Sequence, residues 1–191
     1  MSLPRQRQNQ TVSIKTPQEL VHIKHKITLR QYKYWVLALK SYREAYEAGI
    51  QPDESGFFFM PMRQIEDHLG YKPNKVELRA DMEALRKEAI IFNVLGKDGK
   101  QSQRGSGFIS EWEVSSNWIG YKLPDFLVKC VEQLDLKNAI FQQLNWNVFN
   151  SFSGKYEAIL YKLCKDYIGV HRTPYMPITV FREYMGLREN E

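Results

Sequence analysis

The chain has 191 residues, 43% hydrophobic and 13% aromatic, which is enough to bury one large core or two small ones. It contains no run of about 18 apolar residues that would span a membrane, and its polar first residues lack the apolar segment of a signal peptide. These features exclude a membrane protein and predict a cytoplasmic one without a membrane partner.

The net charge of +5 is concentrated at the amino end. Residues 1–30 carry six basic side chains and one acidic one, which leaves the rest of the chain formally neutral. Residues 1–24 lack periodicity and are expected to form a flexible arm, with a short ordered segment near Leu20 to Ile23. Arg5 and Arg7 near its start are candidate DNA contacts, although a basic arm is equally compatible with a solvated tail.

The next stretch predicts two helices joined through a short strand. The first runs from an N-cap at Thr28 to Gly49, and Phe57 to Phe59 forms the strand. The second spans Met60 to Gly70, where Pro near the start and a terminal Gly suit a short helix that ends abruptly. The side chains of the first helix expected to point inward are Tyr32, Trp35, Val36, Leu39, Tyr42 and Tyr46.

A third helix is predicted from Asn74 to Glu88, with Asn74 as its cap and Glu77 closing a capping box. Its inward face consists of Leu78, Met82, Leu85 and Ala89. Three helices in this order, the last two joined by a tight turn containing Gly, are the layout of a helix-turn-helix domain. Because its acidic and basic residues cancel, packing or dimerisation is the stronger expectation for this helix than base reading. The candidate DNA contacts near its amino end are Lys72, Asn74, Lys75 and Arg79.

A β-hairpin wing should follow the third helix. Ile90 to Leu95 is strand-like, residues 96–100 form a turn, and Phe108 to Ser115 returns with alternating character. The basic tip adds Lys97, Lys100 and Arg104 as candidate DNA contacts, with a mobile hairpin loop as the alternative. The outer edge of these strands is also the expected surface for a homodimer.

The remaining residues predict a strand at Trp118 to Leu123 and a helix opened by Pro124-Asp125. Residues 139–149 are ambiguous between strand and helix, and a further helix spans Ser151 to Gly169. The pattern of Met60 to Gly70 then recurs in Met176 to Gly186, with Tyr175-Met176 as the preceding short strand. The chain thus contains two copies of helix, loop and short helix.

These two copies divide the chain into a first winged-helix domain over residues 25–150 and the start of a second over 151–191. The second lacks its recognition helix, so we expect the amino-terminal part of a longer protein. The fold class is α+β and rich in helix, with a helix-turn-helix and a β-hairpin wing followed by a partial second winged helix.

The sequence shows no convergent set of residues for catalysis, so we expect no enzyme, metal or cofactor. Ser153-Gly154-Lys155 lacks the other residues of a phosphate-binding loop and is a helix start. His22 and His25 do not form a metal-binding pair, and the tyrosines lie on apolar faces. Cys130 and Cys164 are expected to be small buried hydrophobic residues.

The order of these elements resembles the replication initiator (Rep) proteins of iteron-containing plasmids. The resemblance covers most of the chain from about residue 22, and its specific features are Thr28-Leu29, Tyr121-Lys122-Leu123-Pro124, the motif Tyr156-x-x-x-Leu160-Tyr161-x-Leu163, Phe181-Arg182 and Gly186-Leu187.

This resemblance implies a bacterial protein with two winged-helix domains that binds double-stranded DNA repeats at a plasmid origin. The first domain would contact the DNA backbone and dimerise, the second would read bases, and a host initiator and the replicative helicase would be partners. A winged-helix transcriptional regulator is the alternative, because fold does not fix function, and an enzyme acting on DNA ends is a third reading.

Overall fold

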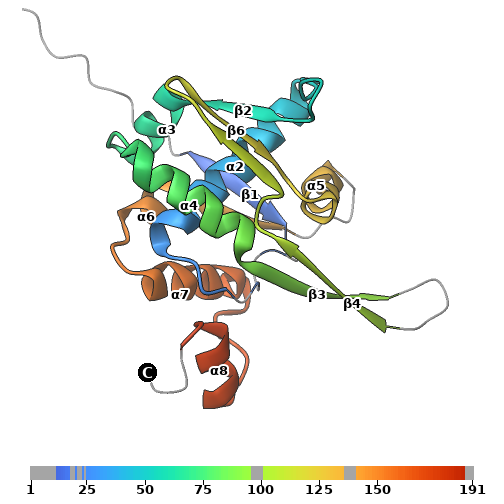
Figure 1. The fold of residues 1–191 in the computed structure, drawn as a ribbon. Coiled ribbons are helices and arrows are strands. Elements are labelled where there is room, and N and C mark those ends of the chain that lie inside the picture. Colours follow the sequence, from blue (N-terminus) through green and yellow to red (C-terminus); the bar gives the residue numbers. More distant parts are fainter. Residues whose placement is uncertain are drawn as a thin grey trace, which may run out of the picture.

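The computed structural model describes residues 12–17, 20, 23, 25–95, 101–135 and 141–187, without the side chains of residues 92–95, 101, 102 and 104 (Figure 1). Its helices are α2 (Leu29–Glu47), α3 (Met62–Leu69), α4 (Lys75–Lys87), α5 (Asp125–Glu132), α6 (Trp146–Ser151), α7 (Lys155–Asp166) and α8 (Ile178–Tyr184). Short 3₁₀ helices follow α5 and α7. The strands are β1 (Ser13–Pro17), β2 (Phe58–Pro61), β3 (Ala89–Leu95), β4 (Gln101–Gly107), β5 (Glu111–Val114), β6 (Trp118–Lys122) and β7 (Phe141–Asn145).

Helix α2 lies at the centre of the fold. The Thr28 side chain accepts a hydrogen bond from the backbone N–H of Gln31, whose side chain accepts one from the Thr28 N–H, so the predicted N-cap is confirmed. Apolar side chains are buried around most of its circumference, as expected for a helix packed on several sides. Tyr46, predicted to point inward, is 41% exposed because the last turn of α2 extends beyond the core.

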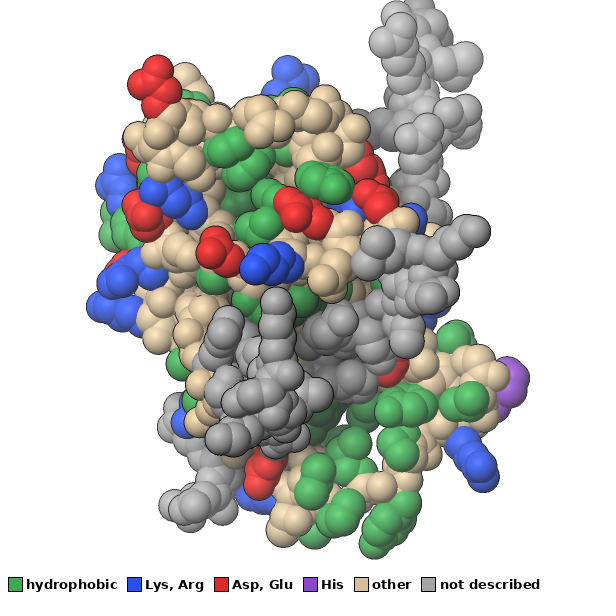
Figure 2. Space-filling view, turned by 90° about the vertical axis from the view of Figure 1, so that its right-hand side faces the viewer, with side chains coloured by type: hydrophobic (Ala, Val, Ile, Leu, Met, Phe, Trp, Pro, Cys, Tyr) green, Lys and Arg blue, Asp and Glu red, His purple; other side chains and the backbone are tan. Residues whose placement is uncertain are grey.

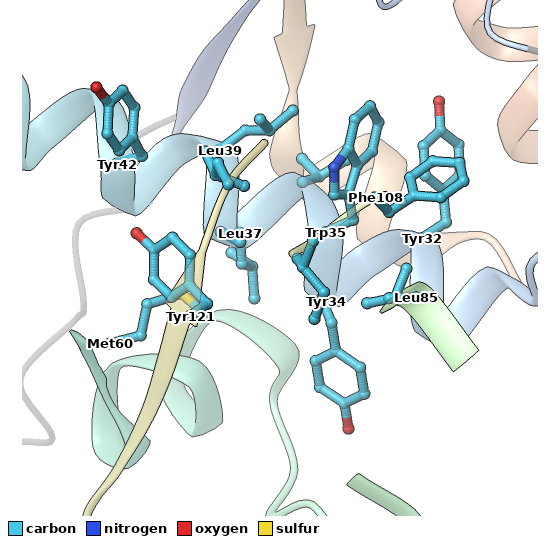
Figure 3. Close-up of a cluster of buried hydrophobic side chains, with 14 of the residues drawn as sticks. Tyr32, Tyr34, Trp35, Leu37, Leu39, Tyr42, Met60, Leu85, Phe108 and Tyr121 are labelled. Atoms are coloured by element: carbon cyan, nitrogen blue, oxygen red, sulfur yellow. The ribbon is translucent and has the colours of Figure 1, made fainter. Parts of the chain in front are cut away.

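Aromatic side chains of α2 form the middle of the core (Figure 3). The ring of Trp35 meets that of Phe108 edge to face with the centroids 5.0 Å apart, and Tyr32 stacks 5.8 Å from Trp35. Tyr34 points to the opposite side of the helix in the same view. Such ring pairs contribute about 0.5–1.5 kcal/mol each beyond their buried area. Because Phe108 directly follows β4, this contact anchors the base of the hairpin against α2.

The helix-turn-helix prediction is confirmed in most of its local detail. Gly70 ends α3 in the left-handed conformation, with φ of 80°. Asn74 caps α4 through its side-chain oxygen, and the predicted inward residues Leu78, Met82 and Leu85 are buried. The predicted capping box does not form, because the Glu77 side chain pairs with Arg30 of α2 instead of the Asn74 backbone. Ala89 does not continue this face: it lies in β3 and is exposed, because α4 ends at Lys87.

The predicted wing has a different returning strand. Strand β3 pairs with β4, so residues 101–107 form the return, whereas the prediction placed it at Phe108 to Ser115. Strand β5, which lies in that segment, instead joins a three-stranded sheet in the order β2-β6-β5. The backbone N–H of Phe108 donates to the carbonyl of Leu85 at the end of α4, which turns the chain from one sheet toward the other.

The amino-terminal prediction is also corrected. Residues 13–17 form β1, which pairs antiparallel with β7 from Ser13 opposite Asn145 to Pro17 opposite Phe141. This strand is not part of a flexible arm, since Ile14 is buried in the main core. The ambiguous segment 139–149 contains both alternatives: β7 is followed at once by α6.

The second copy of the repeat forms α7 and α8, and α8 is the lowest helix in Figure 1. Helix α7 begins at Lys155, four residues later than predicted, and Cys164 on it is exposed, contrary to the prediction, whereas Cys130 is buried. Tyr175-Met176 does not form a strand. In the first copy β2 is held by β6. In the described part of the chain, no strand lies beside residues 175–176 to play that role.

Candidate nucleic-acid interface

The turn between α3 and α4 presents the first half of α4 to solvent. The Asn74 side-chain oxygen accepts hydrogen bonds from the backbone N–H groups of Val76 at 2.9 Å and Glu77 at 3.3 Å. Asn74 therefore fixes the start of the helix while remaining exposed. Helix α4 lies at the front of the molecule in Figure 1, with no other element drawn across it.

The structure brings four of the predicted contacts together on this turn and helix. Lys72, Asn74, Lys75 and Arg79 are all exposed. Lys75 and Arg79 are one helical turn apart on the same side of α4. Among the described residues, neither forms a hydrogen bond or ion pair with another side chain, so their charges are directed at solvent.

The other predicted contacts do not belong to this group. Arg104 lies on β4 opposite Phe92, in the ribbon that projects from the carboxyl end of α4 (Figure 1), and its side chain is not described. Lys97, Lys100, Arg5 and Arg7 lie outside the described residues.

Arg30 on α2 redirects two of the four acidic side chains between residues 75 and 88. Its guanidinium donates to Asp81 at 2.5 Å and to Glu77 at 2.6 Å, and the Gln31 amide also donates to Asp81 at 3.0 Å. Asp81 is only 3% exposed. Hydrogen bonding to Asp81 is the largest cause that raises the pKa of Arg30. These two carboxylates are therefore turned toward α2.

Glu83 is neutralised within its own helix. It accepts two hydrogen bonds from Arg86, at 2.7 and 2.9 Å, and one from the Trp112 indole at 3.0 Å, and Lys87 lies 3.1 Å away. Hydrogen bonding by Arg86, then by Trp112 and Lys87, holds the pKa of Glu83 well below its ordinary value.

The fourth acid, Glu88, is also engaged, because it accepts a hydrogen bond from the backbone N–H of Lys26 at 2.8 Å. The exposed side of α4 therefore presents unpaired Lys75 and Arg79 with the small or apolar side chains of Ala80 and Val76, the latter 73% exposed. The sequence of this helix has equal numbers of acidic and basic residues, but the unpaired ones on its outward face are basic. A basic face whose neighbouring carboxylates are each paired with a cation or a hydrogen-bond donor attracts DNA phosphates.

Sequence reasoning missed Arg30 and Trp112, two residues from other elements that pair with the carboxylates of α4. Part of the signal was present, because Asp81 falls between Leu78 and Met82 on the predicted inward face. A carboxylate at such a position requires a cationic or hydrogen-bonding partner from another element.

The comparison with known families agrees with this geometry. A model of the WH1 domain of initiator replication proteins matches residues 13–165. The chain belongs to this family. The resemblance to initiators of iteron-containing plasmids is thereby confirmed, and a role in plasmid replication initiation with a DNA-binding winged helix follows for this initiator. A search of the curated proteins found no match.

Two further findings concern the described residues alone. No group of three or more His, Cys, Asp or Glu side chains lies close enough in that part of the chain to hold a metal ion. None of the helices found there is both long and apolar enough to cross a membrane.

Proposed function

We propose that this initiator binds the DNA repeats of a plasmid origin. We further propose that its first domain, which includes β1 in addition to residues 25–150, contacts the DNA backbone through the amino-terminal half of α4 and forms a homodimer. The outward basic face of α4 is the observation that carries this proposal. Lys75 and Arg79 supply phosphate contacts, and Lys72 and Asn74 extend them onto the preceding turn. The tip residues Lys97, Lys100 and Arg104 and the arm residues Arg5 and Arg7 are proposed as additional contacts.

The test is fluorescence anisotropy on a duplex, titrated from roughly 50 to 200 mM salt. Each lost phosphate contact lowers the slope of log K against log salt by about 0.9, so Lys75→Ala with Arg79→Ala together should lower it by about 1.8. Lys129→Ala, an exposed basic residue on α5, is the matched control and should leave the slope unchanged. Equal slopes for all three proteins would remove α4 from the interface.

The outer face of the three-stranded sheet is the surface we propose for the dimer, in place of the wing strands. Phe59, Gly120 and Glu113 lie side by side across the three strands. Phe59 is 40% exposed, and its ring meets that of Trp118 edge to face at 4.7 Å. Gly120 has no side chain, and a Cβ there would lie 3.0 Å from the Phe59 ring, so the rings cover the middle strand. An exposed aromatic surface on a sheet suits a self-complementary contact.

Sedimentation analysis of Phe59→Ser tests this surface. The variant should shift the monomer–dimer equilibrium toward monomer, because it removes the central apolar side chain of the contact. Tyr175→Ser is the control, since Tyr175 is 94% exposed but lies far along the chain in the second repeat. A dimer of unchanged affinity in Phe59→Ser would exclude this face.

Residues 151–191 are proposed as the start of a second winged-helix domain. Ile159, Leu163, Tyr184 and Met185 form a small core of their own, separate from the main one. Ile178 is 69% exposed, whereas Met62, its counterpart in the first repeat, is 6% exposed. Hydrophobic side chains gather over this lower part of the molecule in Figure 2. A further helix or sheet packed on α7 and α8 would cover such a face, as neighbouring elements cover α3.

The position of the bound DNA site distinguishes a replication initiator from the alternative function. Footprinting on plasmid DNA should protect tandem repeats at the origin. A lone palindrome at a promoter would instead favour a winged-helix transcriptional regulator. A host initiator and the replicative helicase are proposed partners, and a pull-down with each purified protein tests them directly.

A further inference from the structure

A hollow of about 470 Å³ lies where the end of α2, the turn before β2 and the start of α5 meet. Its volume falls in the range of about 300–1,000 Å³ that is typical of ligand sites in proteins. Phe58, Leu123 and Val128 contribute apolar lining. Tyr46 and Ile50 also line it and are 41% and 58% exposed. Two large hydrophobic side chains therefore remain open to solvent beside this hollow.

The hollow is remote from the basic face of α4. Arg30, in the first turn of α2, binds Asp81 of α4. At about 1.5 Å per residue, Tyr42 and Tyr46, which line the hollow, lie about 18 and 24 Å further along α2. Figure 1 shows α5 and the turn between α3 and α4 on opposite sides of the molecule. A short peptide bound in the hollow would therefore leave the α4 face accessible.

Two carboxylates line the hollow without a cationic partner among the described residues. Asp125 is exposed and forms no ion pair with another described side chain. Glu132 accepts a hydrogen bond from the Tyr42 hydroxyl at 2.7 Å, which is a neutral donor. Lys129, one turn beyond Asp125 on α5, does not line the hollow. Figure 2 faces this side of the molecule, and hydrophobic side chains are exposed between acidic ones in its upper half.

Other basic side chains near the hollow already have acidic partners. Arg43 pairs with both Glu47 and Asp135, and Lys122 pairs with Glu111 at 2.8 Å. The carbonyl end of α2 has no basic residue in its last turn, so the partial negative charge of the helix end is not compensated locally. The hollow thus combines an apolar lining with uncompensated negative charge.

These features fit an arginine side chain from outside the chain. Arginine packs its methylene groups on apolar surface while its guanidinium stays at a polar edge. Tyr46 already makes such a ring contact within the chain, since the guanidinium carbon of Arg43 lies 5.6 Å from the centre of its ring. Asp125 and Glu132 supply carboxylate oxygens, which the planar guanidinium matches better than the ammonium of lysine does.

We propose that this hollow binds an arginine-containing segment of a partner protein. A nucleic acid does not fit, because unpaired carboxylates repel its phosphates. A second copy in a two-fold contact through this surface would bring the same carboxylates of both copies together. This inference goes beyond DNA binding and does not depend on it.

Fluorescence anisotropy with short labelled peptides tests the proposal on the whole chain. The probe is a peptide in which arginine alternates with leucine. Two matched peptides replace each arginine with citrulline, which has a similar shape without the charge, or with glutamate. The arginine peptide should bind more tightly than the citrulline peptide, and the glutamate peptide should not bind.

Paired substitutions locate the binding site. Asp125→Asn with Glu132→Gln keeps the shape of both side chains and a hydrogen-bond acceptor for Tyr42. This double variant should weaken the arginine peptide about five- to tenfold, because two partly exposed charge pairs are lost. Glu66→Gln with Asp67→Asn on α3 removes the same number of charges outside the hollow and should leave the affinity unchanged. Circular dichroism and urea unfolding establish that each variant is folded.

Binding of a DNA duplex to the Asp125 and Glu132 variant separates this proposal from the DNA interface. The salt dependence of duplex binding should be that of the wild type, whether or not α4 contacts DNA. Absence of binding by the arginine peptide, equal binding of the citrulline peptide, or equal affinity in both double variants would overturn the proposal. Self-association in sedimentation that only the Asp125 and Glu132 variant abolishes would assign the hollow to a second copy and overturn it as well.

Discussion

Replacing Arg30 tests whether the acids of α4 are held aside as the structure indicates. In Arg30→Ala the Asp81 side chain, 5% exposed, keeps only the Gln31 amide as a hydrogen-bond partner. Breaking a buried ion pair costs about 3–5 kcal/mol, and breaking an exposed pair costs about 0–1 kcal/mol. Because the Arg30 side chain is itself 42% exposed, this pair lies between those limits. We expect a loss of about 2 kcal/mol in the free energy of unfolding.

The assay is urea unfolding followed by tryptophan fluorescence, with Arg30→Ala, Asp81→Asn and the double variant forming a cycle. The double variant should lose less than the sum of the single variants, because no charge is then left buried without a partner. Lys87→Ala, which removes an exposed partner of Glu83, is the control and should cost about 0.5 kcal/mol or less. If Arg30→Ala is as mild as this control, or if the two single effects add, Arg30 does not hold Asp81 and the explanation of the basic face fails.

Three further outcomes follow from the described contacts. Gly107→Ala should lower the free energy of unfolding by more than about 1 kcal/mol, because its Cβ would lie 2.4 Å from the carbonyl oxygen of Arg86. Gly105→Ala is the control and should lower the free energy of unfolding only slightly, because the nearest atom to its Cβ would be 3.9 Å away. Urea unfolding midpoints measure both variants. Burial lowers the pKa of His25 from 6.5 to about 3. The unfolded chain therefore binds the extra proton between these values, and stability should fall by about 2 kcal/mol from pH 7 to pH 5 on account of this residue. In His25→Phe this part of the pH dependence should disappear, which unfolding curves at the two pH values would reveal. Met62→Ser should lower the free energy of unfolding by about 2–5 kcal/mol because Met62 is buried. Ile178→Ser, at the exposed equivalent position, should change it by about 0.5 kcal/mol or less. Thermal unfolding of the two variants tests this difference.

Features set by neighbouring residues were predictable from the sequence. Thr28 and Asn74 have side chains that satisfy helix N–H groups within three residues, and Gly70 can adopt a positive φ without strain. For this reason the starts of α2 and α4 and the end of α3 were predicted within one or two residues. Only the types of residue at fixed spacings were needed.

Strand pairing was not predictable in the same way. Strand β1 pairs with β7, which lies more than 120 residues further along the chain, so no local pattern identifies its partner. The alternation in Phe108 to Ser115 correctly indicated extended backbone, but it fits pairing with β3 as well as with β6. Gly107 decides between them, because it lets the chain pass the carbonyl of Arg86 and leave the hairpin.

The sequence located the candidate interface but did not predict that its outward face is basic. Lys72, Lys75 and Arg79 were found from their place at the start of a third helix, yet the sum of charges argued against base reading by this helix. That sum treats each residue as if it faced the ligand. The partner of Glu77 and Asp81 is Arg30, which lies 47 and 51 residues earlier and was assigned to the basic amino-terminal part of the chain.

The two copies of the repeat show separately what a local pattern encodes and what it leaves to the rest of the fold. Met62 and Ile178 occupy equivalent positions in helices of similar length that both end at a Gly with positive φ. One side chain is buried and the other is 69% exposed, because β2 and β6 pack on α3, whereas none of the described strands makes a contact of that extent with α8. The pattern therefore encodes the helix, and its neighbours determine burial. Lys162 shows the same separation: helical spacing places it on the inner face of α7, and its burial follows from contacts with Tyr32 and Leu20, which are distant in the sequence.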